Sequence, residues 1–206
     1  MQRLLRKLIL WALRPTVHMY VLPGGKRPQR MTNGALGYDA YLRAVVCPFK
    51  MDPANPQLRL TLFDFRHLPE DLEILKFVEQ RSKPDGSGTE LAWRLDPGAA
   101  ALVGVGFFTS MPDQLGYWVA PRSGLASKHR ITVTNAPGTV DPDYRGEAGV
   151  AVCNMGDKPF YLTHEMRIAQ NLFAWFVFPE IVEVASPAEL PASARGAGGF
   201  GSTGFK

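Results

Sequence analysis

The sequence predicts an all-β fold, a barrel or jelly roll, from three observations. Its 206 residues, 46% of them apolar, are enough for one sizeable core and too few for two full domains. Its 20 Gly and 17 Pro divide the chain into short segments, which favours strands and turns over long helices. From Leu95 onward, short apolar runs recur between Gly, Pro, Asp and Asn turns: LVGVGFF, GYWVAP, ITVTN, GVAVCN, PFYL and IAQNLFAWFVF. We expect these runs to be the strands of the barrel.

Residues 1–36 are expected to form a short amphipathic helix followed by a loop. The helix is predicted over 3–13, where Leu4, Leu5, Leu8 and Trp11 lie at helical spacing. We expect it to pack on the body or on a partner subunit, with contact to a membrane surface as the alternative. Arg14 and Pro15 end the apolar run too early for a signal peptide or a membrane span. The expectation is therefore a soluble, cytoplasmic protein with no membrane partner.

A β domain is expected over 37–184, interrupted by an insertion at about 47–94. Within the insertion, LRLTLFDF alternates like a strand, PEDLEILKFVEQR resembles a helix with acidic residues in its first turn, and KPDGSGTE forms a turn. The insertion is interpreted as a possible extra partner surface. Residues 185–206 are mainly small, so they cannot bury enough apolar surface to fix themselves, and we predict a flexible arm.

Charge and cysteine content restrict the possible functions only weakly. The formal net charge of +4 suits nucleic acid, an acidic membrane surface or a polyphosphate ligand equally well. Lys and Arg are scattered along the chain and form no basic stripe, so direct nucleic-acid binding is not expected. Cys47 and Cys153 have neither the spacing of a metal knuckle nor the number for a disulfide framework, and are interpreted as two buried free thiols in a reducing compartment.

The segment PRSGLASK, Pro121 to Lys128, has the composition of a phosphate-binding turn. Arg122 offers a rigid fork of donors for phosphate oxygens, and Ser123 offers a hydroxyl. Gly124 allows a backbone amide to come close to a ligand. An ordinary turn without a ligand is the alternative.

The segment NAPGTVDPDYRGE, Asn135 to Glu147, resembles a hairpin with dense turn chemistry. The amide of Asn135 and backbone groups near Gly138 suit the polar edge of a pyrimidine. Tyr144 supplies a flat face for a sugar, and Asp141 can orient a water and accept its proton. The alternative is an ordinary Asp-Pro turn.

The segment RGAGGFGSTG, Arg195 to Gly204, combines a basic and an aromatic side chain with five Gly. Glycines let a backbone wrap phosphates, Arg195 can bind the terminal phosphate, and Phe200 can stack on a base. Phosphate loops of the Walker and Rossmann types precede a helix, and no helix is expected here. The segment is therefore either a lid that orders on the substrate or a disordered tail.

Taken together, these segments resemble the trimeric dUTPase family, with five motifs in the family's order. The matching segments are GYDAYL (Gly37 to Leu42), PRSGLASK, NAPGTVDPDYRGE, MRIAQ (Met166 to Gln170) and RGAGGFGSTG. The resemblance implies a dUTPase-like jelly roll, or distorted β-barrel, in a homotrimer with sites at the subunit interfaces. It also implies Mg²⁺-assisted hydrolysis of dUTP to dUMP and pyrophosphate, which removes dUTP and supplies dUMP for thymidylate synthesis.

The resemblance also assigns roles to individual residues. Asp141 would activate the water that attacks the α-phosphorus, and Asp39 would help to hold hydrated Mg²⁺. Asn135 and the backbone of Gly138 and Val140 would bind uracil, while Tyr144 would pack under the deoxyribose and exclude a 2′-hydroxyl. The residues expected to bind phosphates or order the site are Arg122, Ser123, Gly124, Gln170, Arg195, Gly201, Ser202 and Thr203, with Phe200 capping the base.

Two departures from the family pattern and two rival functions bear on this assignment. The chain between the first and second motifs is long because of the insertion. In the fourth motif, Glu165 and Met166 stand where a Gly-acid turn is common, and we expect this second departure to have no effect on function. A dCTP deaminase shares the fold but uses a glutamate a few residues past the motif glycine, where this chain has Ala151. A dUTPase-like regulator without activity would lose the chemistry, yet Asp39 and Asp141 are both present.

Overall fold

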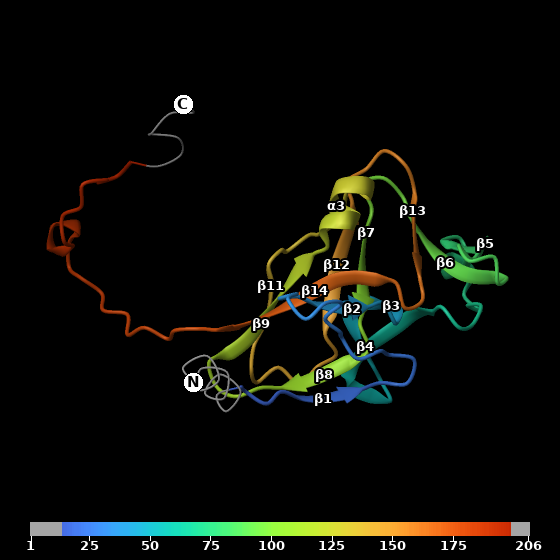
Figure 1. Cartoon of the computed structure of the whole chain (residues 1–206), viewed down its shortest axis with the longest axis horizontal. Coiled ribbons are helices and arrows are strands. Elements are labelled where there is room, and N and C mark those ends of the chain that lie inside the picture. Colours follow the sequence, from blue (N-terminus) through green and yellow to red (C-terminus); the bar gives the residue numbers. More distant parts are fainter. Residues whose placement is uncertain (1–13, 199–206) are drawn as a thin grey trace, which may run out of the picture. The chain divides into compact units, whose positions relative to one another are not determined.

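The computed structural model describes residues 14–198 and shows an all-β body that extends to Phe176 (Figure 1). A second unit, Val177–Lys206, begins where the strands end. The helix predicted at 3–13 lies outside the described residues, as do Phe200, Gly201, Ser202 and Thr203. The predicted all-β class is confirmed.

The body consists of antiparallel strands in two larger and two smaller sheets. The five-stranded sheet has the order β10-β12-β7-β3-β4, and a four-stranded sheet has the order β11-β9-β14-β2. The first contains β3 (Ala44–Asp52), β4 (Asn55–Asp64), β7 (Ala100–Gly104), β10 (Ile131–Val133) and β12 (Gly149–Asn154). The second contains β2 (Tyr38–Tyr41), β9 (Leu115–Pro121), β11 (Gly138–Val140) and β14 (Arg167–Trp175).

Two smaller sheets and three short helical segments complete the described chain. The smaller sheets have the orders β13-β6-β5 and β1-β8. Their strands are β1 (His18–Val21), β5 (Val78–Ser82), β6 (Thr89–Leu95), β8 (Phe107–Ser110) and β13 (Phe160–Thr163), and the helical segments are α2 (Leu72–Leu75), α3 (Ser123–His129) and the 3₁₀ turn η1 (Pro187–Glu189). Within residues 14–198, no helix has the length and apolar character needed to cross a membrane.

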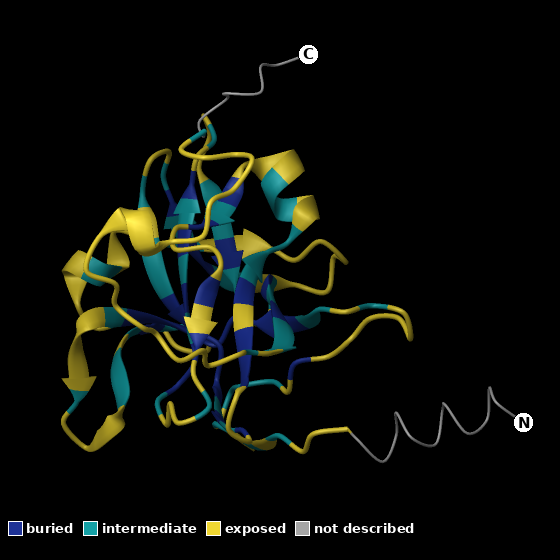
Figure 2. Cartoon of the chain, turned by 90° about the vertical axis from the view of Figure 1, so that its left-hand side faces the viewer, coloured by how far each residue is buried: buried dark blue, intermediate teal, exposed yellow. Residues whose placement is uncertain are grey.

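The core lies between the sheets and follows the two-residue period of the strands. In β12, Val150, Val152 and Asn154 are buried while their neighbours are partly exposed. Figure 2 shows the buried residues concentrated in the strands and the exposed ones in loops and helices. The buried amide of Asn154 is satisfied because it donates to Leu95 O at 2.9 Å and Lys158 O at 2.8 Å.

The insertion contains more strand and less helix than its sequence predicts. The helix expected over PEDLEILKFVEQR is confined to α2, where the Asp71 side chain accepts a hydrogen bond from the Glu73 N–H at 2.8 Å. The following residues form β5, which pairs with β6. Phe77 stacks on Trp93 with 5.0 Å between the ring centroids. Stacking of Phe77 on the buried Trp93 ring and the sheet pairing outweigh the weak local preference for helix.

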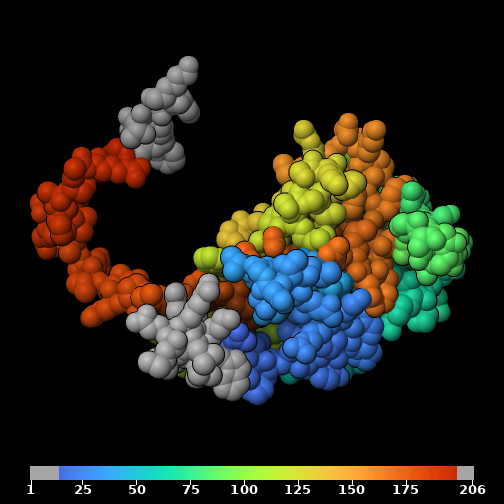
Figure 3. Space-filling model, in the orientation of Figure 1, coloured from blue at the N-terminus to red at the C-terminus, as the bar shows by residue number. Residues whose placement is uncertain are grey.

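The insertion shares the core of the body. Phe63, Phe65 and Trp93 belong to the main cluster of buried side chains, and Phe63 lies 4.7 Å from Phe65 between ring centroids. In addition, β6 pairs with β13 of the main body. Figure 3 shows β5 and β6 as the green lobe at one side of the body. The insertion is therefore an extension of the β domain and not an independent domain.

One strand lies in the region expected to be N-terminal helix and loop. β1 pairs with β8 from His18↔Ser110 to Val21↔Phe107. Met19 and Val21 pack against the core, which explains why this short segment adopts strand geometry. At the other end of the domain, β14 ends at Trp175, nine residues before the expected boundary at residue 184.

A buried ion pair joins the residue directly after the first motif to the last residue of the third. Arg43 donates from Nε and Nη2 to the two carboxylate oxygens of Glu147, each at 2.8 Å. The Arg43 and Glu147 side chains are 9% and 2% exposed. Glu147 Oε1 also accepts the Gly106 N–H at 2.8 Å, and a methyl group at Gly104 would collide with this carboxylate. The pair therefore fixes three separate segments at one point.

Glu147→Gln is predicted to destabilise the fold by about 3–5 kcal/mol, because the Arg43 charge would remain buried without its partner. Urea unfolding followed by circular dichroism measures this loss. The double variant Arg43→Met/Glu147→Leu should recover most of it, since both charges are removed. Glu73→Gln, which breaks the exposed ion pair with Lys76, is the control and should change stability by less than about 1 kcal/mol. Wild-type stability in Glu147→Gln would contradict the prediction.

Candidate functional site

Residues of the first, second and fourth motifs meet at the carboxylate of Asp39. Asp39 lies on β2 and is 9% exposed. Arg122 donates from Nε to Asp39 Oδ1 at 3.1 Å, and Arg167 donates from Nη1 to Asp39 Oδ2 at 3.1 Å. Both carboxylate oxygens therefore orient an arginine.

The four-stranded sheet explains why these residues meet. β14 lies between β9 and β2, and its Gln170 pairs with Asp39 on one side and Ala120 on the other. Arg122 follows the end of β9, which places it beside Asp39. The β14–β2 register shifts between Arg167 and Ala169, a bulge that re-aims the Arg167 side chain.

Gln170 closes this group, which we call the arginine cradle: Asp39, Arg122, Arg167 and Gln170. Gln170 donates from Nε2 to Pro121 O at 2.9 Å. A methyl group at Gly37 would collide with Gln170 Oε1, so the first motif requires glycine at this position. The cradle lines an open cavity of about 530 Å³. Two guanidinium groups at the cavity wall make it suitable for phosphate oxygens.

The second motif is a helix, where a turn was expected. α3 begins at Ser123 directly after Arg122, and its backbone bonds include Ala126 N–H to Arg122 O at 3.0 Å. It ends at His129 and is capped by Arg130, which has the left-handed conformation with φ 56°. Ser123 and Gly124 are exposed in its first turn, next to the arginine cradle.

The third motif passes between two sheets and is not the predicted hairpin. β10 pairs with β12, whereas β11 pairs with β9. The sequence resembles a hairpin because its residues do form turns. However, the short strands β10 and β11 do not pair with each other, since each pairs with a longer strand. Asn135 is exposed on the connection, and a methyl group at Gly138 would lie 3.1 Å from Asn135 Nδ2. Glycine therefore lets the Asn135 amide lie against the backbone.

Asp141 and Tyr144 form an exposed pair directly after β11. Tyr144 donates its backbone N–H to Asp141 O at 3.3 Å and its hydroxyl to Glu147 O at 3.1 Å. A methyl group at Gly146 would collide with the Tyr144 hydroxyl, so glycine is needed beside the ring. Tyr144 is 40% exposed, and Asp141 makes no ion pair within the part of the chain that the structure describes. The carboxylate is free to accept a proton from water.

The Asp141–Tyr144 pair and the arginine cradle of one chain lie apart. In the order β11-β9-β14-β2, three strand spacings separate β11 from β2, which is about 14 Å. Val140 pairs with Tyr117, and Tyr117 pairs with Phe173, so Asp141 is also displaced along β14 from Asp39 by about four residues, or about 13 Å. The resulting separation is roughly 20 Å. Two groups that act on one phosphorus must be much closer than this.

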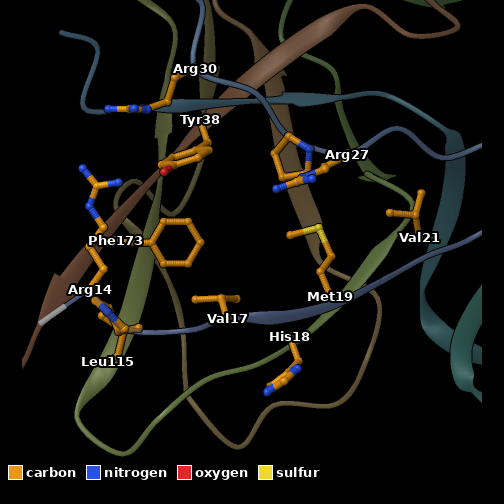
Figure 4. Close-up of a pocket in the computed structure, with 12 residues that line it drawn as sticks. Arg14, Val17, His18, Met19, Val21, Arg27, Arg30, Tyr38, Leu115 and Phe173 are labelled. Carbon is orange, nitrogen blue, oxygen red and sulfur yellow. The ribbon is translucent and has the colours of Figure 1, made fainter. Parts of the chain in front are cut away.

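A further cavity, of about 710 Å³, lies on the other face of β2 (Figure 4). Tyr38 points into it, because adjacent side chains on a strand face opposite sides and Asp39 faces the cradle. The Tyr38 ring meets Phe173 edge-on at 5.4 Å between centroids, and the Arg30 guanidinium lies 5.7 Å from its centroid. The described lining has no carboxylate, so we do not place the chemistry here.

Arg195 lies in the second unit, where it is exposed and donates from Nε to Gly198 O at 2.7 Å. Arg167 is the cradle residue that sequence reasoning missed. In the sequence, Arg167 is a basic residue within the otherwise apolar segment MRIAQ. That pattern alone does not show whether the side chain faces solvent or a binding site. Within residues 14–198, no three His, Cys, Asp or Glu side chains are grouped as metal ligands.

The structure thus defines a class of protein: an all-β protein with a cavity walled by two arginines, and with an exposed carboxylate and aromatic ring on a separate segment. A sequence model of the dUTPase family matches residues 91–204. The deoxyuridine 5′-triphosphate nucleotidohydrolase of Rhizobium etli strain CIAT 652 is 49% identical over 110 residues, covering 53% of this chain and 69% of the relative. That of Rhizobium rhizogenes is 50% identical over 117 residues, covering 57% and 72%. The chain belongs to the dUTPase family, as its motifs predicted.

Solved structures share the fold at low sequence identity. A mutant dUTPase of Staphylococcus bacteriophage 80alpha, solved with dUpNHpp, has a TM-score of 0.61 and 17% identity, covering 92% of this chain and 98% of that one. The dUTPase of phage phi11 of S. aureus, described for its species-specific insert, has a TM-score of 0.56 and 14% identity, covering 85% and 99%. These similarities confirm the predicted dUTPase-like β fold.

Asp39→Asn is predicted to weaken binding of dUTP, the nucleotide in the relatives' name, by about tenfold or more, because Arg122 and Arg167 lose the carboxylate that orients them. Isothermal titration with a non-hydrolysable dUTP analogue measures the dissociation constant. Asp64→Asn is the matched control, since it removes a carboxylate that pairs with Arg66 at 2.6 Å within the insertion. Equal affinity in Asp39→Asn and wild type would contradict the prediction.

Proposed function

We propose that the chain hydrolyses dUTP to dUMP and pyrophosphate, with Asp141 as the general base. Family membership and the names of the relatives support the activity and confirm that prediction. The observation that carries the mechanism is the exposed Asp141 carboxylate beside the open face of Tyr144. In this mechanism Asp141 accepts a proton from a water, the water oxygen bonds to the α-phosphorus, and pyrophosphate leaves.

In this mechanism the arginine cradle binds the phosphates. Arg122 and Arg167 neutralise charge on the phosphate chain, and Asp39 holds both guanidinium groups in position. Ser123 and Gly124, exposed in the first turn of α3, add a hydroxyl and backbone donors. Gln170 keeps the end of β9 in place through Pro121 O.

The segment around β11 binds the nucleoside. Asn135 and the backbone of Gly138 and Val140 supply donors and acceptors for the uracil edge, which is supported by the close approach of Gly138 to the Asn135 amide. Tyr144, fixed through its hydroxyl to Glu147 O, packs under the deoxyribose. An aromatic wall in this position leaves no room for a 2′-hydroxyl and so selects deoxyribose by steric exclusion.

Mg²⁺ fits this site as a hydrated ion bound mainly to substrate phosphates. Both oxygens of Asp39 are engaged by arginines, so this carboxylate would help to hold an ion through water. Mg²⁺ commonly keeps several waters and uses phosphate oxygens as ligands. When bound, it would supply charge neutralisation at the phosphates. Arg195 and the residues Phe200, Gly201, Ser202 and Thr203 would close the site over base and phosphates.

A homotrimer with shared sites is the assembly we propose. The separation of roughly 20 Å between Asp141 and Asp39 within one chain supports it, because another copy must supply the second half of each site. Large apolar side chains after β14 are also exposed, including Val177 at 86% and Ile181 at 89%. Apolar surface of this kind favours burial against a partner subunit.

An additional partner bound by the insertion remains a prediction. Leu68, Leu72 and Phe77 are exposed around α2 and supply apolar surface for such a contact. Deamination of dCTP is not supported, because Ala151 lies in strand β12, where a deaminase would need a carboxylate.

Asp141→Asn is predicted to lower kcat for dUTP by at least about 10³-fold while leaving nucleotide affinity within a few-fold of wild type, because the amide cannot accept the proton. Pyrophosphate release and analogue binding measure the two quantities. Asp143→Asn, two residues away, is the control and should keep most of the activity. Near-normal turnover in Asp141→Asn would show that another group is the base.

Mixing inactive variants tests the shared site. Trimers refolded from Asp141→Asn and Asp39→Asn/Arg122→Ala chains should regain activity, because some sites then combine an intact Asp141 with an intact cradle. Mixtures of Asp141→Asn and Tyr144→Ala should stay inactive, since both defects lie in the same half. Failure of the first mixture to exceed the second, in trimers shown to contain both chains, would place each site within a single chain.

A further inference from the structure

The inserted β3–β4 hairpin reaches the half-site that contains Asp141 and Tyr144. An open cavity of about 490 Å³ lies between them. The third motif lines it with Asp141, Asp143, Tyr144, Arg145 and Gly146, and the hairpin lines it with Met51, Pro56, Gln57 and Arg59. The volume lies within the usual range for small-molecule sites. These hairpin residues lie between the first motif, which ends at Leu42, and the second, which begins at Pro121, so the five family motifs do not contain them.

The hairpin is held in a defined shape at its tip and base. Asp52 Oδ1 accepts the Ala54 N–H at 2.9 Å, and Asn55 Oδ1 accepts the Gln57 N–H at 3.2 Å. Between the pairs Val46↔Thr61 and Met51↔Arg59, β3 advances five residues while β4 advances two, so β3 bulges. Arg59 donates from Nη1 to Pro48 O inside this bulge. The bulge thus holds Arg59 where it lines the cavity.

The charges in the cavity favour a nucleotide contact by Arg59. Asp141 and Asp143 place two carboxylates where an anionic substrate must approach, which costs electrostatic energy. Arg145 is held against the third motif, because its Nη1 donates to three backbone oxygens: Pro142 O at 2.7 Å, Tyr144 O at 3.2 Å and Thr109 O at 3.4 Å. Within the described chain, Arg59 makes one hydrogen bond, from Nη1, so its guanidinium is less constrained than that of Arg145, and Nε and Nη2 remain to bind a phosphate oxygen.

We propose that the inserted hairpin forms a wall of the dUTP site, in which Arg59 binds a phosphate oxygen and Gln57 contacts the nucleotide. The inference rests on the proposed function in one respect, the placement of dUTP against Asp141 and Tyr144. Arg59 is then a binding residue that the family motifs do not contain. It offsets the repulsion between the two carboxylates and the substrate.

The test measures binding of the non-hydrolysable dUTP analogue with Mg²⁺ by calorimetry, and KM and kcat for dUTP, in the full-length protein. Arg59→Ala should raise the dissociation constant and KM by about tenfold with kcat unchanged, because the contact is equal in ground and transition states. Arg59→Lys should recover part of the loss, since the charge returns without the planar fork. Gln57→Ala should raise KM by about threefold.

Arg81→Ala is the matched control. Arg81 lies in the same insertion, on β5, and its guanidinium covers the Tyr161 ring at 3.6 Å. Its loss should leave KM unchanged. Arg59 also donates to Pro48 O, so its loss could weaken the hairpin itself. The melting temperature of each variant shows whether a lower affinity comes from a lost nucleotide contact or from a destabilised hairpin. Gln57 provides the second variant, since its side chain makes no hydrogen bond within residues 14–198.

Affinities within twofold of wild type in both Arg59→Ala and Gln57→Ala would overturn the inference. It would also be overturned if Arg59→Ala lost affinity only together with a lower melting temperature while Gln57→Ala had no effect. Failure of the proposed function gives a different result, because wild-type protein would then bind the analogue without releasing pyrophosphate from dUTP. In that case the binding measurements on the hairpin variants still decide the inference.

Discussion

The buried pair of Arg43 and Glu147 is the interaction on which the arrangement of both half-sites depends. Arg43 follows the strand that carries Asp39, and Glu147 ends the segment that carries Asp141 and Tyr144. Desolvation of two charges is tolerated here because Glu147 accepts two guanidinium bonds and the Gly106 N–H together. Removal of either partner would leave an uncompensated charge in the core. The pair therefore ties the segment after β2, the segment before β12 and the turn between β7 and β8 together at one point.

Within one chain this frame separates the chemistry into two halves. The sheet order places β9 and β14 between Asp141 and Asp39, so no side-chain movement can unite them. The separation accounts for the proposed symmetry of the assembly, since copies related by rotation can bring unlike halves together. Each half is stiff for a local reason. Gly37 lets Gln170 close the cradle, and Gly146 lets Tyr144 lie flat.

The insertion contributes residues to the cavity beside Asp141 and none to the cavity of the arginine cradle. Its aromatic side chains, Phe63 and Trp93 among them, are part of the main core, so it cannot move as a separate domain. Its β3–β4 hairpin lies beside Asp141 and adds the Arg59 cation to a cavity that contains two carboxylates.

The departure from the family pattern in the fourth motif has a local structural explanation. Glu165 adopts φ 56°, the conformation for which glycine is suited, and its side chain is held by Lys26 at 2.6 Å.

The sequence by itself determined the all-β class, the family and the motif residues, because turn residues, two-residue periodicity and motif order are local properties. It predicted a hairpin at Asn135–Glu147 and a helix over PEDLEILKFVEQR, and both were wrong because these segments pair with strands outside them: β11 with β9, and β5 with the next strand, β6. Arg167 and Arg59 were missed because a charged strand residue looks the same in sequence whether it faces solvent or a cavity. Only the tertiary structure decided which motifs meet and which stay apart, because that depends on sheet order and register between segments far apart in the chain.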